Sequence, residues 1–352
     1  MRMIGDEEQV SFVPMPCVSE DGKIDASVIR TFGEVKKGYT TFAEKDVLFA
    51  KITPCMENGK GAIAKGLKNG VGCGSSEFHV LRPVDGIVTS EWLYYLTAWS
   101  RFRKEAEKHM TGSAGQRRVP KAYLENYEVH LPSKVIQERQ TKILYHLQNI
   151  IDHRKNEILR LDELIKARFV EMFANGNHDW QEVSIADICE DTRTGPFGSA
   201  LHHDEFVDSG VFVLGIDNAV ENKFSYNRMR YITDEKYEKL KRYTVYPGDV
   251  IITIMGTVGR SAVIPDDMPK AINTKHLACL TPDATIVDSY FLSNVFQIHP
   301  VIRGQLERQC KGAIMDGLNL TIIKGLRFEL PPLELQKEFV QFFKQVDKSK
   351  VV

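Results

Sequence analysis

Basic and amide side chains are concentrated between residues 101 and 121. This stretch contains seven cations and two acidic residues, a local charge of +5. Arginine and glutamine suit bidentate contacts with guanine and adenine edges in the major groove of DNA, whereas lysine, serine and backbone amides suit phosphates. A solvated, charged helix face is the alternative interpretation. The predicted DNA-contacting residues here are Arg101, Arg103, Lys104, Ser113, Gln116, Arg117, Arg118 and Lys121.

A second stretch with similar chemistry lies about 200 residues later in the chain. Residues 303–327 carry a net charge of +3, and their polar loop, residues 312–319, has different side chains from the first loop. Different loops on one scaffold suit two domains that read different sequences, although neutral drift would produce the same pattern. The predicted contacts in this stretch are Arg308, Lys311 and Asn319.

Two shorter polar clusters follow predicted strands and are either DNA contacts or plain turns. They contain Asn58 and Lys60 in the first half, and Asn273, Lys275 and His276 in the second. The pair His202-His203 has no third or fourth ligand at a recognisable spacing, so we predict a surface pair and no metal site. Gly256-Thr257-Val258-Gly259 lacks the Lys-Ser/Thr of a phosphate-binding loop and predicts a tight turn.

The sequence lacks the motifs that DNA-modifying catalysis requires. It has no glycine-rich S-adenosylmethionine loop, no Asn/Asp-Pro-Pro-Tyr-like tetrad, no Asp…Glu-x-Lys arrangement for Mg²⁺, no Walker A sequence and no G-x-S-x-G elbow. We therefore expect no catalysis by this chain and no cofactor bound to it.

Length and composition are those of an ordinary globular protein with about two domains. The 352 residues include 46 Lys plus Arg and 47 Asp plus Glu, a formal charge of −1, and 43% are hydrophobic, which excludes a disordered tail and a strongly basic coat protein. No apolar run reaches the roughly 18 residues of a membrane helix, and the first residues show no signal core. The six dispersed cysteines predict buried thiols. The cytoplasm is the expected compartment.

An internal repeat of about 200 residues organises the chain. The run 46–52 resembles 249–255, an offset of 203, and Leu131-Pro132 followed by Gln137 recurs as Leu330-Pro331 followed by Gln336, an offset of 199. In both halves a strand-rich stretch, a short amphipathic helix, a polar loop, a strand and a closing helix follow in the same order. This order predicts a duplicated α+β domain.

The helix expected from about Lys134 to Ala174 has apolar residues at steps of three and four. Such a heptad seam implies a helical partner, either within the chain or on another chain. The distal helix after Pro332 has a similar apolar face. The seam residues are Leu144, Leu147, Ile151, Ile158, Leu161 and Ile165, with Phe339 and Phe343 on the distal helix.

With two strand-rich domains separated by a long heptad helix, the chain resembles the specificity (S) subunit of a Type I restriction-modification system. The motifs that carry the resemblance include Ser11-Phe12-Val13-Pro14-Met15 and 112–120 in the first half. In the second half they include 195–199, Tyr246-Pro247-Gly248-Asp249, 256–260, 273–276 and 330–336.

The resemblance implies two target recognition domains, each reading one half of a split asymmetric DNA site, and helices that hold them apart. It also implies docking to methyltransferase (M) subunits and, through them, to restriction (R) subunits. S-adenosylmethionine, Mg²⁺ and ATP would then belong to those partners. The implied segments are 1–132 (first recognition domain), 133–176 (central helix), 177–331 (second recognition domain) and 332–352 (distal helix). A protein-interaction scaffold, or an inactive recognition cassette, is the alternative function.

Two complete copies of the repeat would need about 400 residues, so about 50 are unaccounted for. The missing block corresponds to the opening of the first domain, the counterpart of Trp180 to Val183, and to the second half of the distal helix. We therefore expect an exposed seam on the central helix beyond about Ile158. A partner chain, a second S subunit or an upstream start codon would supply the block.

Overall fold

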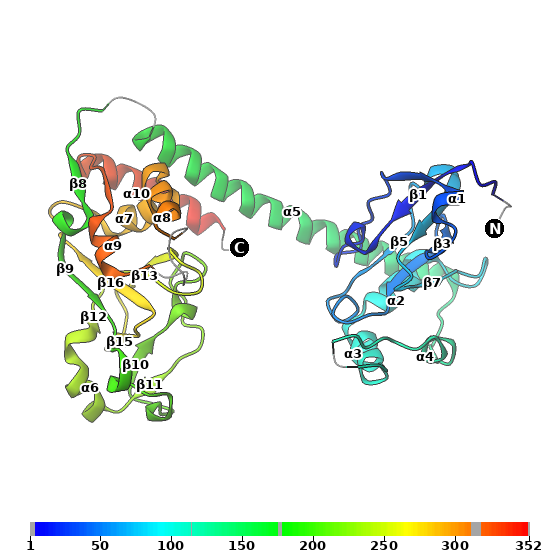
Figure 1. Ribbon diagram of the computed structural model, residues 1–352, viewed down its shortest axis with the longest axis horizontal. Helices are drawn as coiled ribbons and strands as arrows, with labels where there is room; N and C mark the ends of the chain where they lie inside the picture. The colour runs from blue at the N-terminus through cyan, green and yellow to red at the C-terminus, as the bar shows by residue number, and fades with distance from the viewer. Residues whose placement is uncertain (1–3, 114, 175–177, 311–317, 351–352) are drawn as a thin grey trace. The chain divides into compact units, whose positions relative to one another are not determined.

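The computed structural model describes residues 4–113, 115–174, 178–310 and 318–350 (Figure 1). The chain divides into two compact units, residues 1–153 and 154–352. The border falls inside helix α5 (Lys134–Phe173), so each unit contains one half of that helix. The long helix is thus confirmed, whereas the four segment boundaries expected from the resemblance stay a prediction.

Two small sheets form the core of the first unit. One has the strand order β2-β1-β6-β3, with β1 and β6 parallel, and the other has the order β5-β4-β7. Strand β4 is apolar and buried along its whole length, because both of its faces pack inside the unit. The strands are β1 (Gln9–Val13), β2 (Ile29–Thr31), β3 (Thr40–Ala43), β4 (Val47–Ala50), β5 (Gly61–Ile63), β6 (Val71–Gly74) and β7 (Phe78–Leu81).

Short helices follow these strands in the first unit. Helix α2 begins where the Thr89 hydroxyl accepts a hydrogen bond from Trp92 N at 3.1 Å, a favourable N-cap. Helix α3 buries Phe102 and Ala106 against the sheet strand β4. The helices are α1 (Phe32–Val35), α2 (Ser90–Ala98), α3 (Ser100–Lys108) and α4 (Lys121–Glu125), with 3₁₀ turns η1 (Met15–Cys17) and η2 (Lys68–Gly70).

The second unit repeats both sheets and adds strands. Its sheets have the orders β11-β10-β15-β12, again with one parallel pair, and β14-β13-β16-β9, and a third sheet pairs β17 with β8. The strands are β8 (Glu182–Ser184), β9 (Cys189–Thr194), β10 (Val211–Leu214), β11 (Tyr231–Ile232), β12 (Thr244–Val245), β13 (Val250–Thr253), β14 (Ser261–Val263), β15 (Ala271–Asn273), β16 (Leu277–Pro282) and β17 (Arg327–Glu329).

The helices of the second unit occur in the same order as those of the first. The Asp288 carboxylate caps α7 as Thr89 caps α2. The helices are α6 (Asp234–Leu240), α7 (Ser289–Ile298), α8 (Pro300–Cys310), α9 (Leu320–Gly325) and α10 (Leu333–Ser349). The 3₁₀ turns are η3 (Ile185–Ile188), η4 (Gly198–Ala200), η5 (His203–Glu205), η6 (Ile216–Asn218) and η7 (Lys241–Tyr243). No helix in the described ranges has the length and apolar composition needed to span a bilayer.

A buried glutamine confirms the repeat at the level of single hydrogen bonds. Gln137 donates to the carbonyls of Ile87 and Pro132, at 2.9 and 2.8 Å, and accepts from Thr89 N at 3.0 Å. In the second unit, Gln336 repeats this pattern with the carbonyls of Ile286 and Pro331 and with Asp288 N. Both glutamine residues are fully buried. Each long helix is therefore tied at its first turn to the start of α2 or α7.

The acidic residue that precedes the central strand of each unit also has a matching role. Asp46 accepts two hydrogen bonds from Arg82, at 2.8 and 2.6 Å. In the second unit, Asp249 pairs with Arg193, which lies on β9. The first unit has no counterpart of β9 among its described residues, so its arginine comes instead from the residue that follows β7.

The two halves of α5 have different surroundings. Ile165, Phe169 and Phe173 are buried in the core of the second unit, where Phe169 lies 5.2 Å (ring centroids) from Phe339 of α10. The ion pair between Arg168 and Glu338 at 3.1 Å adds to this contact. The expectation of an exposed seam beyond Ile158 is therefore wrong, because α10 covers that part of the helix.

The exposed seam residues lie earlier in the helix, as the burial of each side chain shows. Leu161 and Phe343 pack partly buried against the core of the second unit. The seam residues exposed to solvent are Leu144, Leu147, Ile151 and Ile158.

A buried histidine predicts an acid-sensitive second unit. His299 is 4% exposed, contacts the rings of Phe169 and Phe328, and its Nδ1 has no hydrogen-bond partner among the described residues. Burial lowers the pKa of His299 to about 4. The unfolded chain takes up this proton near pH 6.5 and the folded chain does not, so stability falls as the pH drops from about 6.5 to about 4, by about 3 kcal/mol in total.

We expect the His299→Leu variant to lose this part of the pH dependence. Denaturant unfolding at pH 7.5, 6 and 5 measures it, with the exposed His146→Leu as the matched control. An equal loss of stability in acid for the wild type and the His299 variant would contradict the assignment.

Candidate nucleic-acid interface

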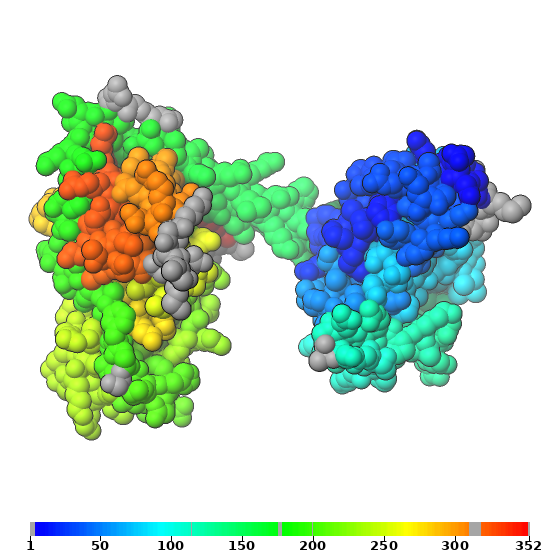
Figure 2. All heavy atoms as spheres, in the orientation of Figure 1, coloured from blue at the N-terminus to red at the C-terminus, as the bar shows by residue number. Residues whose placement is uncertain are grey.

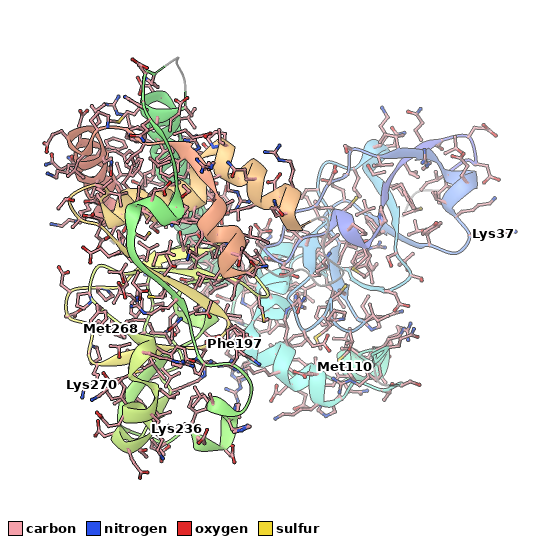
Figure 3. All side chains as sticks on the ribbon, turned by 60° about the vertical axis from the view of Figure 1, so that its left-hand side comes forward. Lys37, Met110, Phe197, Lys236, Met268 and Lys270 are labelled. Carbon is pink, nitrogen blue, oxygen red and sulfur yellow. The ribbon has the colours of Figure 1, made fainter. Side chains whose placement is uncertain are left out.

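The loop after α3 folds back on itself as a narrow hairpin. Thr111 and Arg118 exchange two backbone hydrogen bonds, of 3.0 and 2.8 Å. Met110, labelled in Figure 3 at the end of α3, is buried at the base of the hairpin. The hairpin carries Ser113 and Gln116, which are both exposed. These two predicted residues are therefore accessible to a ligand.

A second loop, residues 51–60, lies against this hairpin. Thr53 N donates to the carbonyl of Arg117 at 3.0 Å, and Val119 N donates to the carbonyl of Lys51 at 2.9 Å. Backbone hydrogen bonds therefore join the two loops directly. The loop 51–60 follows β4 directly, and the bridge between Ile52 and Arg118 holds the hairpin beside it.

The contact between the loops brings together two polar clusters that the sequence predicts separately. Glu57 of the second loop lies 3.8 Å from the guanidinium of Arg117. Its neighbour Asn58 is exposed. Lys60 is half-buried, and its Nζ lies 3.4 Å from the carbonyl of Met15. The surface formed by residues 51–60, 111–113 and 115–118 is called the first recognition surface below.

Arg118 is already paired within the first recognition surface. Its guanidinium donates to both carboxylate oxygens of Glu77, with Nε and Nη2 each 2.9 Å from one oxygen, a bidentate arrangement. These hydrogen bonds lower the pKa of Glu77 and raise the pKa of Arg118. A base edge would therefore have to displace Glu77 to engage this arginine.

Arg117 is held more weakly than Arg118. Its guanidinium lies 3.8 Å from Glu57 and 3.9 Å from Glu107, beyond the length of a normal hydrogen bond. Its side chain is partly exposed. Arg117 is thus the more available of the two adjacent guanidinium groups. The acidic residues Glu57 and Glu77 offset part of the local positive charge.

Three other basic residues predicted for the first unit lie on helices and not on the two loops. Arg101 and Lys104 are exposed on α3, where the guanidinium of Arg101 lies 5.8 Å from the ring centre of Trp99. Lys121, at the start of α4, is exposed and pairs with Glu125 at 2.8 Å. These residues are accessible but do not belong to the loops of the first recognition surface.

The prediction that Arg103 contacts DNA is wrong. Its residue exposure is 6%, its Nη1 donates to the carbonyl of Met56 at 2.6 Å, and its guanidinium lies over the ring of Phe49. Burial lowers the pKa of Arg103 to about 10, so it stays protonated at neutral pH. This arginine acts in the core beneath the 51–60 loop, out of reach of a bound duplex.

The second unit assembles the matching surface from its own loops. Leu318 N donates to the carbonyl of Ile254 at 3.1 Å, as Val119 does to Lys51, and Ile254 N donates to the carbonyl of His276 at 3.0 Å. These bonds bring the chain near residue 319, the turn 254–260 and the turn 273–276 together. We call this group the second recognition surface.

Asn273 does not have the predicted role. It is fully buried and its Nδ2 donates to the carbonyl of Leu277 at 3.0 Å, so it stabilises the turn and is not accessible to DNA. Lys275 in the same turn is exposed, and His276 is half-buried. Burial, together with the charges of Lys275 and Arg230, lowers the pKa of His276.

The remaining predicted residues lie on helices or outside the described residues. Arg308 is exposed on α8 and lines a hollow between α8 and α9. Figure 2 shows these two helices, in orange, on the surface of the second unit. Asn319 is exposed but caps α9, where its Oδ1 accepts from Ile322 N at 2.9 Å. Lys311 lies outside the described residues.

Sequence reasoning missed two arginine residues at the second recognition surface. Arg230 forms a close ion pair with Asp217 and acts on the pKa of His276, and Arg228 is exposed 3.9 Å from Asp217. The Arg-x-Arg pattern at 228–230 was the available signal. Among the residues that the structure describes, no group of three or more His, Cys, Asp or Glu side chains is placed to hold a metal ion.

Comparisons with known proteins agree on one protein family. The model of the Type I restriction modification DNA specificity domain matches residues 8–160 and again residues 177–351. The EcoEI specificity subunit of Escherichia coli is 44% identical over 161 residues, which are 45% of this chain and 27% of that protein. The EcoAI specificity subunit of the same species is 43% identical over 157 residues, 44% of this chain and 26% of that protein. The matched segment therefore spans about a quarter of each of these relatives.

Solved structures show the same fold over nearly the whole chain. A chain from a study of complex assembly and conformational transition in a type I R-M system covers 98% of this chain and 85% of its own length, with 17% identity and a TM-score of 0.56. The Type-I restriction-modification S subunit from M. genitalium covers 99% and 84%, with 13% identity and a TM-score of 0.55. Because the family model matches both units, the chain belongs to the family of Type I restriction modification DNA specificity domains.

Proposed function

We propose that this chain is a non-catalytic specificity subunit that recognises a bipartite, asymmetric DNA site. The observation that carries the proposal is the repetition of one scaffold with two different recognition surfaces. Both units join a loop after the central strand to a loop before the closing helix by equivalent backbone hydrogen bonds. The side chains on those loops differ, as two unlike half-sites require.

The first recognition surface has the chemistry to read bases. Gln116 is exposed and Arg117 is partly exposed, and two backbone hydrogen bonds between Thr111 and Arg118 close this hairpin, which limits the entropy lost on binding. Glutamine and arginine match adenine and guanine edges in the major groove. Nearby Lys51 and Lys121 add positive charge suited to phosphates.

The second recognition surface offers a different set of donors. Lys275 and Arg228 are exposed cations, and His276 presents an imidazole whose lowered pKa keeps it neutral at physiological pH. A neutral imidazole both donates and accepts hydrogen bonds, whereas the guanidinium of Arg117 on the first hairpin only donates. We infer that the two units read different base sequences.

Helix α5 supports the assignment of a spacer and a docking surface. Its first half exposes the apolar side chains Leu144, Leu147 and Ile151, and Ile158 is exposed just after the border between the units. Methyltransferase subunits are the proposed partners for this helix, and restriction subunits join through them. S-adenosylmethionine, Mg²⁺ and ATP are assigned to those partners, and the cytoplasm, where they meet DNA, is the proposed compartment.

Substitution of Arg117 tests the first recognition surface. We expect Arg117→Ala to weaken binding to a duplex selected by the wild-type chain by about 1–3 kcal/mol, the value of a bidentate base contact. Arg118→Ala should cost less, because its guanidinium must first leave Glu77. Glu77→Gln should strengthen binding, because it releases Arg118. Equilibrium titrations with the selected duplex measure the binding free energy of all three variants.

The matched control is Lys37→Ala, which removes an exposed cation outside both loops. In the Arg117→Ala variant, discrimination between duplex sequences should relax at one half-site only. Equal losses on every duplex sequence would assign Arg117 to phosphates. Unchanged binding in all variants, with methyltransferase binding retained, would favour a scaffold role instead.

Lengthening α5 tests the spacer. Insertion of one heptad after His153 adds about 10 Å of helix and nearly preserves its face. We expect the unspecified spacer between the half-sites to lengthen, by up to about three base pairs at 3.4 Å each. Selection of bound sequences from a random duplex library measures both the spacer length and the two half-sites. Altered half-sites with an unaltered spacer would contradict the role of α5.

A further inference from the structure

Three strands of the second unit bring their loops to the same end of one sheet. In the sheet β14-β13-β16-β9, Thr253 pairs with Leu277 and Ala278 pairs with Thr194. The end of β13, the start of β16 and the end of β9 therefore lie side by side. The turn 273–276, which precedes β16 and belongs to the second recognition surface, lies between the loops that follow β9 and β13.

A glycine holds the loop after β9 against that turn. A Cβ atom on Gly195 would lie 2.2 Å from the carbonyl oxygen of Asn273 and 2.2 Å from the carbonyl carbon of Thr274, so only glycine allows this close approach. The next residue, Pro196, is buried and its ring fixes φ. The backbone of the loop 195–198 is therefore fixed beside the second recognition surface.

The two loops beside the turn each carry an exposed apolar side chain. Phe197, labelled in Figure 3, is 56% exposed, and Met255 in the turn 254–260 is 41% exposed. Between these loops lie the exposed Lys275 and the half-buried His276. This end of the sheet therefore combines positive charge with apolar surface that is accessible to a ligand.

The corresponding end of the first unit has a different chemistry. Ala50 pairs with Phe78 there, so Glu77 corresponds to His276, because each directly precedes its strand. The Glu77 carboxylate binds the guanidinium of Arg118. The first recognition surface thus presents paired charges at this place, whereas the second presents a cation between two apolar side chains.

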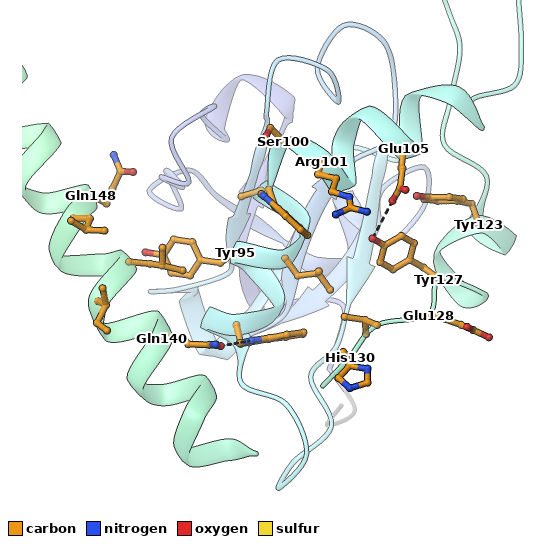
Figure 4. A pocket seen from close by; sticks show the side chains of 18 of the residues that line it. Tyr95, Ser100, Arg101, Glu105, Tyr123, Tyr127, Glu128, His130, Gln140 and Gln148 are labelled. Carbon is orange, nitrogen blue, oxygen red and sulfur yellow. Dashed lines mark hydrogen bonds between the residues drawn. The ribbon is translucent and has the colours of Figure 1, made fainter. Parts of the chain in front are cut away.

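The position of Phe197 on a loop also differs from that of aromatic residues in the first unit. Tyr95, Tyr123 and Tyr127 line a hollow of about 1590 Å³ between α2 and the first half of α5 (Figure 4). A hollow cannot enter the major groove of DNA, which is itself concave. Phe197 lies on an exposed loop, from which a side chain is able to reach base edges in that groove.

Thymine is the base whose major-groove edge carries an apolar group, the 5-methyl group, and phenylalanine is among the side chains that contact it. We propose that Phe197 contacts the 5-methyl group of a thymine in the half-site read by the second unit, a proposal that rests on the proposed recognition function. Phe197 is then a specificity-determining residue of the second unit. The neighbouring Lys275 supplies positive charge suited to phosphates.

Deoxyuridine tests this contact, because it differs from thymidine only in lacking the methyl group. In a duplex selected by the full chain, each thymine is replaced in turn within the half-site at which Arg117→Ala leaves discrimination unchanged. One replacement should weaken binding by the wild-type chain about three- to fivefold, the value of one buried methyl or methylene group. Phe197→Ala should bind the thymine duplex more weakly by at least that factor, and should bind both duplexes equally.

Two further variants serve as controls in the same titrations. Phe197→Leu keeps an apolar side chain and should retain part of the preference for thymine. Val84→Ala changes a residue of the first unit that is also 56% exposed, and it should leave the preference unchanged. Because Phe197 is exposed, its variants should have the same melting temperature as the wild-type chain, which separates lost contact from lost fold.

The possible results separate this contact from the recognition function on which it rests. A thymine preference that persists in Phe197→Ala, no costly replacement in that half-site, or an equal loss on every duplex would overturn the contact and leave bipartite recognition intact. Weaker methyltransferase binding by Phe197→Ala, with an unchanged thymine preference, would instead assign Phe197 to a protein interface. Failure of the wild-type chain to select any bipartite sequence would overturn the recognition function and, with it, this contact.

Discussion

Two buried glutamine side chains fix the geometry on which both units depend. Gln137 and Gln336 each bond three backbone groups. Two are carbonyls, one at the Leu-Pro corner and one in the loop before α2 or α7, and the third is the N–H of the residue that caps that helix. Loss of such a side chain would orphan several buried polar groups at once, each costing about 1–3 kcal/mol. The first turn of each long helix is therefore fixed to its unit by a hydrogen-bonded joint.

This joint lets one scaffold carry different loops. The strands, caps and helices of the two units are stabilised by buried apolar side chains and by backbone bonds, and the recognition loops add single buried anchors such as Met56 and Ile254. The loops can then change sequence without loss of the fold. The first unit presents Gln116 and Arg117, and the second presents Lys275 and His276. A shared frame with separate loop chemistry is what reading two unrelated half-sites demands.

Local patterns predicted the parts of the fold that depend on local physics. The heptad pattern of α5 and the repeated Leu-Pro and glutamine motifs report periodicity and fixed turns, so the sequence alone was sufficient. The burial of Arg103 and Asn273 depends on which face of an element meets the sheet. The pairing of Arg118 with Glu77 joins residues 41 positions apart. Such contacts arise from tertiary packing, which spacing does not reveal.

The packing of α10 on α5 shows the same limit of prediction from sequence. The sequence indicated a missing block of the repeat and an exposed seam, but it did not show that α10 folds back over Phe169. The seam is therefore exposed up to and including Ile158, whereas Ile165 and Phe169, which follow it, are buried. The contact of α10 with the second half of α5 joins residues about 170 positions apart, which sequence spacing does not reveal.

The central claim is that the two units read two separate DNA sequences. Its most direct test is selection from a random duplex library by the chain in complex with a methyltransferase subunit. The account predicts two conserved blocks separated by a fixed stretch of unspecified sequence, and loss of one block alone when residues 111–118 are replaced by a Gly-Ser turn. A single continuous block, or loss of both blocks in that variant, would contradict it.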